Sequence, residues 1–225
     1  MGEILFRTKL SENLFKGLSP WMQRLPGGLI HVNVVGCALF AAISGSSAAT
    51  VATVGKMSIP ELRKRNYPEK ILLGSLAGSG TLGLLIPPSI ILIIYGVAVQ
   101  ESIAKLFIAG IIPGIMIALI FMSYVIIWSL INKKKMPKVL EKYSFLEKMK
   151  RSQQLLPVIL LILSVIGSIY TGIATATEAA SLGVVGALIL SFFQKSLTFE
   201  TFKSSLLGAT KTSCMIAFIL AGSTF

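Results

Sequence analysis

Small polar residues interrupt two long apolar segments of this chain. The first segment runs from Leu29 to Ile59 and is interrupted at Ser44-Gly45-Ser46-Ser47. The second runs from Ile71 to Val99, with interruptions at Gly78-Ser79-Gly80-Thr81 and Pro87-Pro88-Ser89. Hydroxyls, freed backbone carbonyls and helix N-termini at such breaks are suited to binding a sodium ion and a carboxylate.

These breaks define the candidate site, to which Thr50 and Ser79 add further hydroxyls. Hydroxyl and carbonyl oxygens are hard ligands for sodium, and glycine lets backbones approach closely. The predicted sodium ligands are Ser44, Gly45, Ser46, Ser47, Gly80 and Thr81. Ser44, Ser46 and Ser89 are predicted to bind the substrate carboxylate. The alternative is that the small residues only allow close helix packing, as in Gly74-xxx-Gly78.

Residue types that would support other chemistry are scarce. The chain has one histidine, His31, and no aspartate, and no His/Cys cluster has metal-ligand spacing. The glycine-rich run 78–83 lacks the Gly-Lys-Ser/Thr ending of a phosphate-binding loop. We therefore predict that the chain is not an enzyme and has no cofactor, with sodium serving only as a coupling ion.

The composition indicates an integral membrane protein. Of the 225 residues, 54% are hydrophobic and 13% are charged, where a soluble domain has about 25% charged residues. The net charge of +12 comes from basic residues in short connections, where they set membrane orientation. Aromatic residues are not interleaved with them, so we predict no nucleic-acid partner and instead contact with membrane lipid.

The elements that must position the site follow from segment length, since about 20 apolar residues span a bilayer. Residues 29–59 form two short arms and are predicted to be a re-entrant hairpin. The predicted order is an amphipathic interfacial segment (1–28), the hairpin (29–59), a cytoplasmic loop (60–70), a discontinuous transmembrane helix (71–99), a transmembrane helix (106–131), a basic cytoplasmic loop (132–154), two transmembrane helices (155–193), and a connection with the truncated start of a second repeat (194–225).

Charge distribution favours the hairpin. The loop 132–154 is the most basic and is predicted to be cytoplasmic, so 100–105 lies outside and 60–70 inside. A single span through 29–57 would place residues 1–27, with Arg7, Lys9, Lys16 and Arg24, outside. A hairpin that returns to its own side keeps every basic flank in the cytoplasm.

Three polar residues beside the apolar segments have two interpretations each. His31 and Asn33 open the hairpin, where they bond loop carbonyls or take part in the site. Glu178 follows Thr177 at a predicted helix start, where an acid complements the helix dipole. The alternative role for Glu178 is a proton or ion relay.

Several motifs in order resemble one membrane family. They are Leu25-Pro-Gly-Gly-Leu-Ile-His-Val-Asn-Val-Val, Ile43-Ser-Gly-Ser-Ser-Ala-Ala-Thr, Gly80-Thr-Leu-Gly-Leu-Leu-Ile-Pro-Pro-Ser-Ile, Phe107-Ile-Ala-Gly-Ile-Ile-Pro-Gly and Thr175-Ala-Thr-Glu-Ala-Ala. Together they resemble the large permease subunit of tripartite ATP-independent periplasmic (TRAP) transporters over nearly the whole chain. Ala176 departs from the proline that this family often has there.

The resemblance implies an all-α, multi-pass protein of the bacterial inner membrane that works as a sodium-coupled elevator. It implies import of small organic acids of the dicarboxylate or sugar-acid type. The implied partners are a small membrane subunit and a periplasmic substrate-binding protein. The family serines map to the tip 44–47 and to Ser89.

The resemblance also implies inverted repeats, of which the first is complete here and the second is truncated. We therefore expect either a partial chain or a disrupted reading frame, which is not expected to transport by itself. The alternatives to a transporter subunit are an inactive or structural fragment of such a permease and a channel-like pore.

Overall fold

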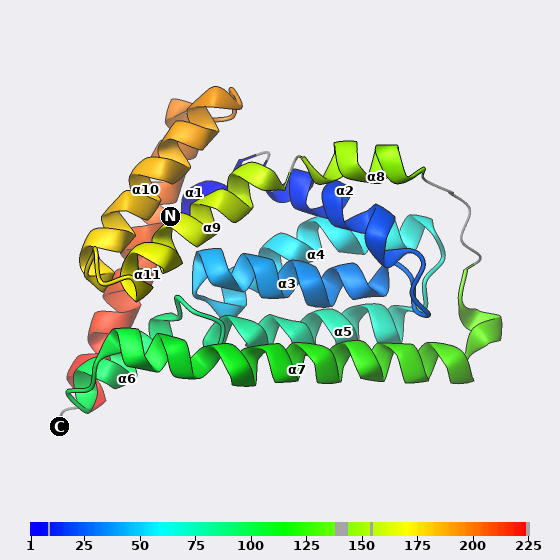
Figure 1. Cartoon of the computed structure of the whole chain (residues 1–225), viewed down its shortest axis with the longest axis horizontal. Coiled ribbons are helices and arrows are strands. Elements are labelled where there is room, and N and C mark those ends of the chain that lie inside the picture. The colour runs from blue at the N-terminus through cyan, green and yellow to red at the C-terminus, as the bar shows by residue number, and fades with distance from the viewer. Residues whose placement is uncertain (9, 138–143, 154, 224–225) are drawn as a thin grey trace.

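The computed structural model describes residues 1–8, 10–137, 144–153 and 155–223, and every element in these ranges is a helix (Figure 1). The all-α fold predicted from the sequence is therefore confirmed. The helices are α1 (Gly2–Phe6), α2 (Leu10–Met22), α3 (Ile30–Ser44), α4 (Ser47–Lys64), α5 (Glu69–Gly80), η1 (Thr81–Leu84), α6 (Ile90–Ala98), α7 (Ile103–Ile131), η2 (Lys133–Lys135), α8 (Phe145–Ser152), α9 (Leu156–Tyr170), α10 (Ala176–Phe193) and α11 (Phe199–Ser223).

Helices α3 and α4 form an antiparallel hairpin at the centre of the molecule (Figure 1). With 15 residues, α3 is about 22 Å long, shorter than the roughly 30 Å hydrocarbon core of a bilayer. Eleven of its residues are buried, among them Val32, Cys37 and Phe40, because α2, α4, α5 and α7 surround it. The hairpin is thus embedded in protein, as irregular backbone at membrane depth must be.

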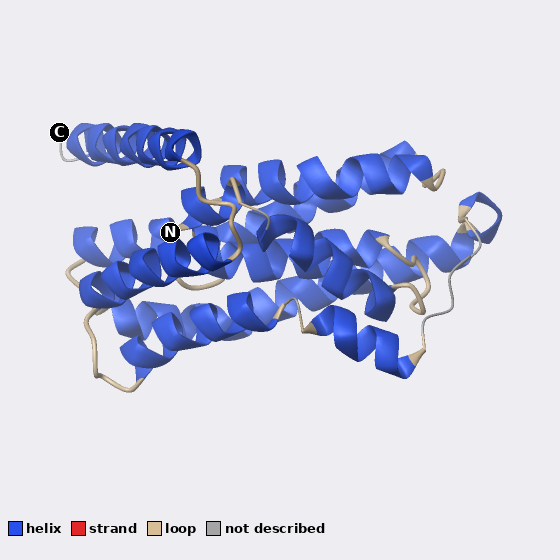
Figure 2. Ribbon diagram, turned by 90° about the horizontal axis from the view of Figure 1, so that it is seen from above, coloured by secondary structure: helices blue, strands red, loops and turns tan. Residues whose placement is uncertain are grey.

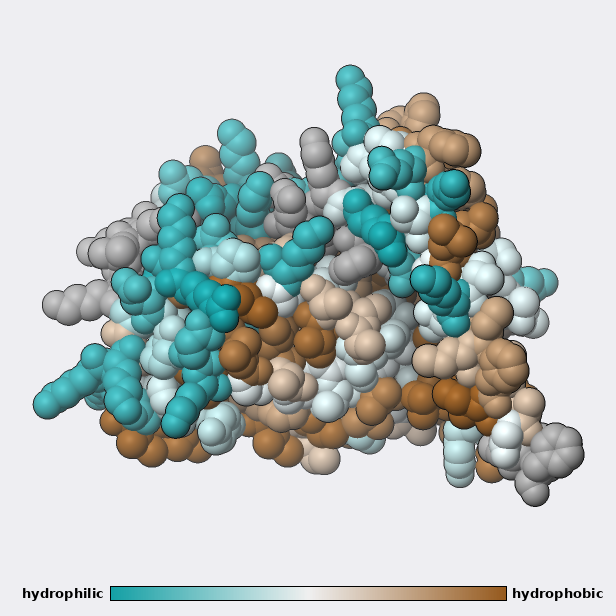
Figure 3. Space-filling model, turned by 180° about the vertical axis from the view of Figure 1, so that it is seen from behind, coloured by the Kyte–Doolittle hydropathy of each residue, from teal (hydrophilic) through white to brown (hydrophobic). Residues whose placement is uncertain are grey.

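Both ends of the hairpin lie at one end of the molecule. The Tyr67 hydroxyl, just after α4, accepts a hydrogen bond of 3.1 Å from the backbone N–H of Leu29, just before α3. A Cβ built on Gly27 would lie 2.7 Å from Val125 Cγ1, in the last two turns of α7. Hydrophilic side chains gather at this end, whereas hydrophobic ones line the edge along which α7 runs (Figure 3). The hairpin therefore starts and finishes beside the basic residues that follow α7.

The second interrupted segment lies beside the hairpin. It consists of α5, the single turn η1, an irregular stretch at 85–89 and the short helix α6. Helix α7 then runs back along α5 and the hairpin for 29 residues, about 43 Å (Figure 1). The segment is divided in this way, rather than forming one bent helix, because Pro87 and Pro88 have no backbone N–H to donate within a helix.

Two helices among the described residues are long and apolar enough to cross a membrane, namely α7 and α10. A third span results if α8 and α9, which meet at 52°, are counted as one. Side chains on α7 such as Ile112 and Ile131 are each 77% exposed, as expected for a surface that meets lipid. How each element sits in the membrane stays a prediction.

Three element boundaries differ from the sequence-based expectation. Helix α4 continues through Pro60 to Lys64, into the predicted loop 60–70, where Arg63 and Lys64 in its last turn complement the helix dipole. The predicted interfacial segment 1–28 forms α1 and α2, and α2 packs on the hairpin through Leu14 and Leu18. The predicted connection from residue 194 is mostly one helix, α11, which lies along one side of the bundle (Figure 2).

Helix α11 runs across a polar stretch, and its hydroxyls find acceptors within the helix. Ser205, Thr210 and Thr212 donate to the carbonyls four residues earlier, at 2.8, 2.9 and 3.1 Å. Such back-bonding satisfies a hydroxyl inside a helix at a small cost in helix stability. Lys138, Glu141 and Lys142 of the predicted basic loop lie outside the described residues.

Candidate functional site

The first break is a tight turn between α3 and α4. Gly45 ends α3 in the left-handed conformation, with φ of 62°, which glycine adopts without strain. Ser46 is the N-cap of α4, and its hydroxyl accepts the backbone N–H of Ala49 at 3.5 Å. The Ser-Gly-Ser-Ser sequence therefore supplies both the helix stop and the helix start.

Hydroxyls hold this turn closed. Ser44 Oγ lies 2.9 Å from Thr50 Oγ1, and both hydroxyls donate to the Ser46 carbonyl, at 3.2 and 2.7 Å. The Ser46 carbonyl also accepts the Thr50 N–H at 3.0 Å. This carbonyl is already bonded three times, so the turn is a preorganised network rather than an open loop.

The two breaks meet directly. The backbone N–H of Ile90, at the start of α6, donates to the Gly45 carbonyl at 3.2 Å. A Cβ on Gly45 would lie 2.6 Å from the Pro88 carbonyl oxygen. One on Gly83 would lie 2.8 Å from both Ser46 C and Ser47 N. Glycine at both positions is what lets the hairpin tip reach the second break.

Four helix ends converge at this contact. The C-terminal ends of α3 and η1 carry partial negative charge, which favours a cation. The N-terminal ends of α4 and α6 carry partial positive charge, which favours a carboxylate. Among the described residues, no group of three or more His, Cys, Asp or Glu side chains could hold a metal ion. A cation here would therefore be held by hydroxyl and carbonyl oxygens.

The predicted site residues differ in availability. Ser47 Oγ is buried and has no hydrogen-bond partner in the structure, so this oxygen is available as a cation ligand. Ser89 is fully buried, and its hydroxyl donates to the Leu84 carbonyl at 2.6 Å. Gly80 packs on Val51 of α4. Thr81 is exposed, and its hydroxyl donates to the Gly78 carbonyl at 2.7 Å.

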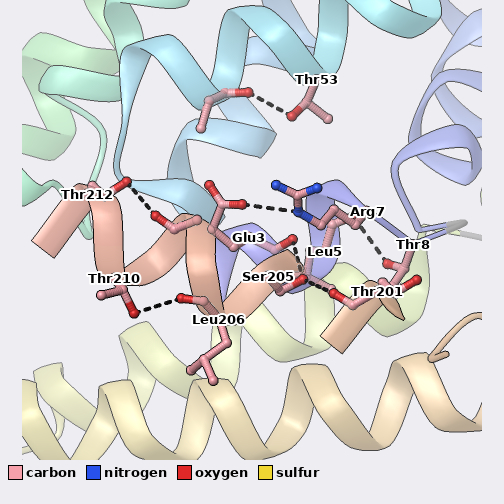
Figure 4. Close-up of polar contacts among 12 residues, drawn as sticks. Glu3, Leu5, Arg7, Thr8, Thr53, Thr201, Ser205, Leu206, Thr210 and Thr212 are labelled. Atoms are coloured by element: carbon pink, nitrogen blue, oxygen red, sulfur yellow. Dashed lines mark hydrogen bonds and ion pairs between the residues drawn. The ribbon is translucent and has the colours of Figure 1, made fainter. Parts of the chain in front are cut away.

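The structure brings α1 to the same place, which the sequence analysis missed. A Cβ on Gly2 would lie 2.8 Å from Ser44 Cα. The next residue, Glu3, pairs with Arg7 Nε at 3.3 Å, and its backbone carbonyl accepts the Ser205 hydroxyl at 3.2 Å (Figure 4). An acidic side chain therefore follows the residue that touches the hairpin tip, and its carboxylate packs against Gly208 of α11. No local pattern could reveal it, because Ser205 is 202 residues away along the chain.

The polar residues that had two interpretations now have partners. His31 Nε2 lies 2.8 Å from the Pro26 carbonyl, as expected for a residue that bonds a loop carbonyl. Asn33 instead donates to the Leu72 carbonyl at 3.2 Å and to Ser75 Oγ at 3.0 Å, which ties the hairpin to α5. Glu178 forms a capping box with Thr175, consistent with the helix-start interpretation.

Known proteins have sequences similar to this one. The family described as "Tripartite ATP-independent periplasmic transporter, DctM component" matches residues 1–225. The C4-dicarboxylate TRAP transporter large permease protein DctM of Pseudomonas aeruginosa is 39% identical over 87% of this chain and 45% of its own length. The sialic acid large permease SiaM of Vibrio cholerae is 33% identical, over 99% and 52%. The ectoine/5-hydroxyectoine large permease UehC of Ruegeria pomeroyi is 34% identical, over 98% and 51%.

The chain belongs to the DctM family of TRAP transporter large permeases. Members of this family are integral inner-membrane transport proteins rather than enzymes, so the predicted localisation and the prediction that the chain is not an enzyme are confirmed. TRAP permeases work with a periplasmic binding protein and a small membrane subunit. The chain spans about half the length of these three relatives.

Proposed function

We propose that this chain is part of a sodium-coupled permease that imports small organic acids, by an elevator movement of the hairpin and the broken helix. The contact between the hairpin tip and the second break carries the proposal. Two helix C-terminal ends and two N-terminal ends meet there, and the chemistry of such ends suits a cation beside a carboxylate. Two of the relatives are named for C4-dicarboxylate and sialic acid, which supports an acid as substrate.

In this proposal Ser47 donates its unpartnered hydroxyl oxygen to sodium, together with carbonyl or hydroxyl oxygens of Ser44, Gly45 and Ser46. Gly80 and Thr81 complete the ion site from the second break. Ser44, Ser46 and Ser89 orient the substrate carboxylate. Because Thr81 and Ser89 each donate to a nearby carbonyl, their hydroxyls must rotate to serve a ligand. The proposed partners are a small membrane subunit and a periplasmic binding protein that delivers the substrate.

The test is substrate uptake by the assembled transporter in vesicles, measured against sodium concentration. Ser47→Ala removes one proposed ligand oxygen and should raise the sodium concentration for half-maximal uptake roughly 5- to 150-fold, as a loss of about 1–3 kcal/mol implies. Ser123→Ala, at an exposed serine of α7 away from both breaks, is the control and should behave as wild type. Saturable uptake that ignores sodium would refute the coupling ion. Uptake that never saturates would favour a channel-like pore.

A further inference from the structure

A groove runs between α5 and α7, on residues that the candidate site does not use. Its volume is about 300 Å³, within the range of small-molecule sites. It is lined by Gly74, Ser75, Ile120, Phe121, Tyr124 and Val125. A Cβ built on Gly74 would meet no atom within 4 Å, so the α5 wall is open where a side chain would otherwise stand.

The groove requires an apolar occupant and opens where hydrocarbon would be. Ile120 and Tyr124 are 56% and 57% exposed on α7, which is long and apolar enough to span the membrane. The one buried polar side chain in the lining, Ser75, is already bonded, since it donates to the Leu72 carbonyl and accepts from Asn33. Ser75 is therefore not available to bond a ligand, and this wall of the groove offers mainly apolar contact.

Lysines lie at the same end of both helices that form the groove, in the first turn of α5 and just after α7. Lys70 is exposed and lies one turn before Gly74, on the same face of α5. The exposed lysines of η2 follow α7, which itself ends about 9 Å along its axis from Val125. The turn η2 thus places three consecutive exposed lysines just after the end of α7.

We propose that this groove binds an anionic phospholipid, with one acyl chain lying between α5 and α7 and the phosphate held by Lys70 and the lysines of η2. Positive charge at the end of an apolar groove complements a lipid that has a hydrocarbon chain and a negative headgroup. The groove takes a hydrocarbon chain, and the ammonium groups at its basic end take a negative headgroup. Trp128, one turn beyond Tyr124, is three residues from the end of α7, and tryptophan is enriched where transmembrane helices reach the headgroups.

Trp128 is also a built-in reporter. The chain has two tryptophans, so Trp21→Phe leaves Trp128 as the sole source of indole fluorescence. The protein is reconstituted in phosphatidylcholine vesicles, and brominated phosphatidylglycerol or brominated phosphatidylcholine is added as quencher. Competition between the brominated and unbrominated lipids gives the relative affinity near Trp128. We expect phosphatidylglycerol to bind at least about fivefold more tightly, the effect of one lysine near an anionic headgroup.

Two variants separate the two halves of the site. Gly74→Leu fills the groove and should reduce quenching by both lipids. Gly167→Leu is its control, because a Cβ at this helical glycine of α9 also meets nothing within 4 Å. Replacing four lysines by glutamine should bring the preference for phosphatidylglycerol close to one; these are Lys70, Lys133, Lys134 and Lys135. The charge-matched control replaces four exposed lysines elsewhere, namely Lys105, Lys150, Lys203 and Lys211.

Each other outcome overturns the proposal. Equal affinity for the two lipids in the wild type would remove the headgroup contact. A preference that survives Gly74→Leu unchanged would show a lipid on the outer surface rather than in the groove. Brominated oleate that binds as tightly as phosphatidylglycerol would point to a free fatty acid. Absence of quenching by any lipid would show that a protein segment covers the groove.

Discussion

At Gly83 a single hydrogen in place of a side chain determines how closely the two breaks approach. The built Cβ meets backbone atoms of Ser46 and Ser47, which belong to a helix start and cannot swing aside as a flexible side chain would. The hydroxyls of the tip are held in a network, so a displaced backbone would also disturb Ser44 and Thr50.

Gly83→Ala is therefore expected to separate the hairpin tip from the second break. Overpacking of this kind costs about 1–3 kcal/mol of unfolding free energy. Uptake by the variant that still folds should also fall, because the helix ends no longer converge. Gly167→Ala is the matched control, since its Cβ also meets open space. Uptake and thermal unfolding are measured on both variants. Wild-type uptake by Gly83→Ala would show that close contact of the breaks is not required.

At the scale of elements, the hairpin is held at its two outer ends, before α3 and after α4, as well as at its tip. The Tyr67 hydroxyl accepts the N–H of Leu29, and Gly28, with φ of 55°, leaves room for the phenol ring. Burial raises the pKa of Tyr67 above its ordinary value, so the hydroxyl stays protonated near neutral pH. Arg63 Nε pairs with Glu69 at 2.6 Å and links the end of α4 to the start of α5, but this exposed pair contributes little.

Tyr67→Phe should destabilise the hairpin by about 1–3 kcal/mol, because it leaves the buried N–H of Leu29 without an acceptor. The melting temperature of the solubilised protein reports the loss. Tyr95→Phe removes a hydroxyl from a side chain that is 54% exposed and should leave the melting temperature unchanged. Equal melting of Tyr67→Phe and wild type would mean that water replaces the lost acceptor.

For the whole molecule, the distribution of charge predicts the orientation in the membrane. The two outer ends of the hairpin and the lysines after α7 lie at one end of the molecule, and the turn 99–102 between α6 and α7 lies at the other (Figure 1). With positive residues inside, the first end faces the cytoplasm. An ordinary span through 29–57 would place residues 1–27 on the opposite side from the lysines.

Single cysteines test this orientation in a protein whose Cys37 and Cys214 are replaced by alanine. Cysteines at Lys16 and Lys64 should react only with a reagent on the cytoplasmic side. A cysteine at Glu101, in the turn between α6 and α7, should react only from the other side and serves as the control. Labelling of positions 16 and 64 from opposite sides of sealed vesicles would exclude the re-entrant hairpin.

The sequence by itself determined the helical membrane class, the two breaks and the family, because composition, apolar run length and contiguous motifs are local properties of the chain. Hydroxyl and glycine types near residues 44–47 and 80–89 also indicated the candidate site. Only the tertiary structure showed that Gly45 bonds Ile90, that Gly83 abuts Ser46 and that Gly2 lies against Ser44. It likewise showed that the polar stretch after residue 198 is helical. The reason is that contacts between distant residues depend on how helices pack, and packing depends on shape complementarity that no single segment encodes.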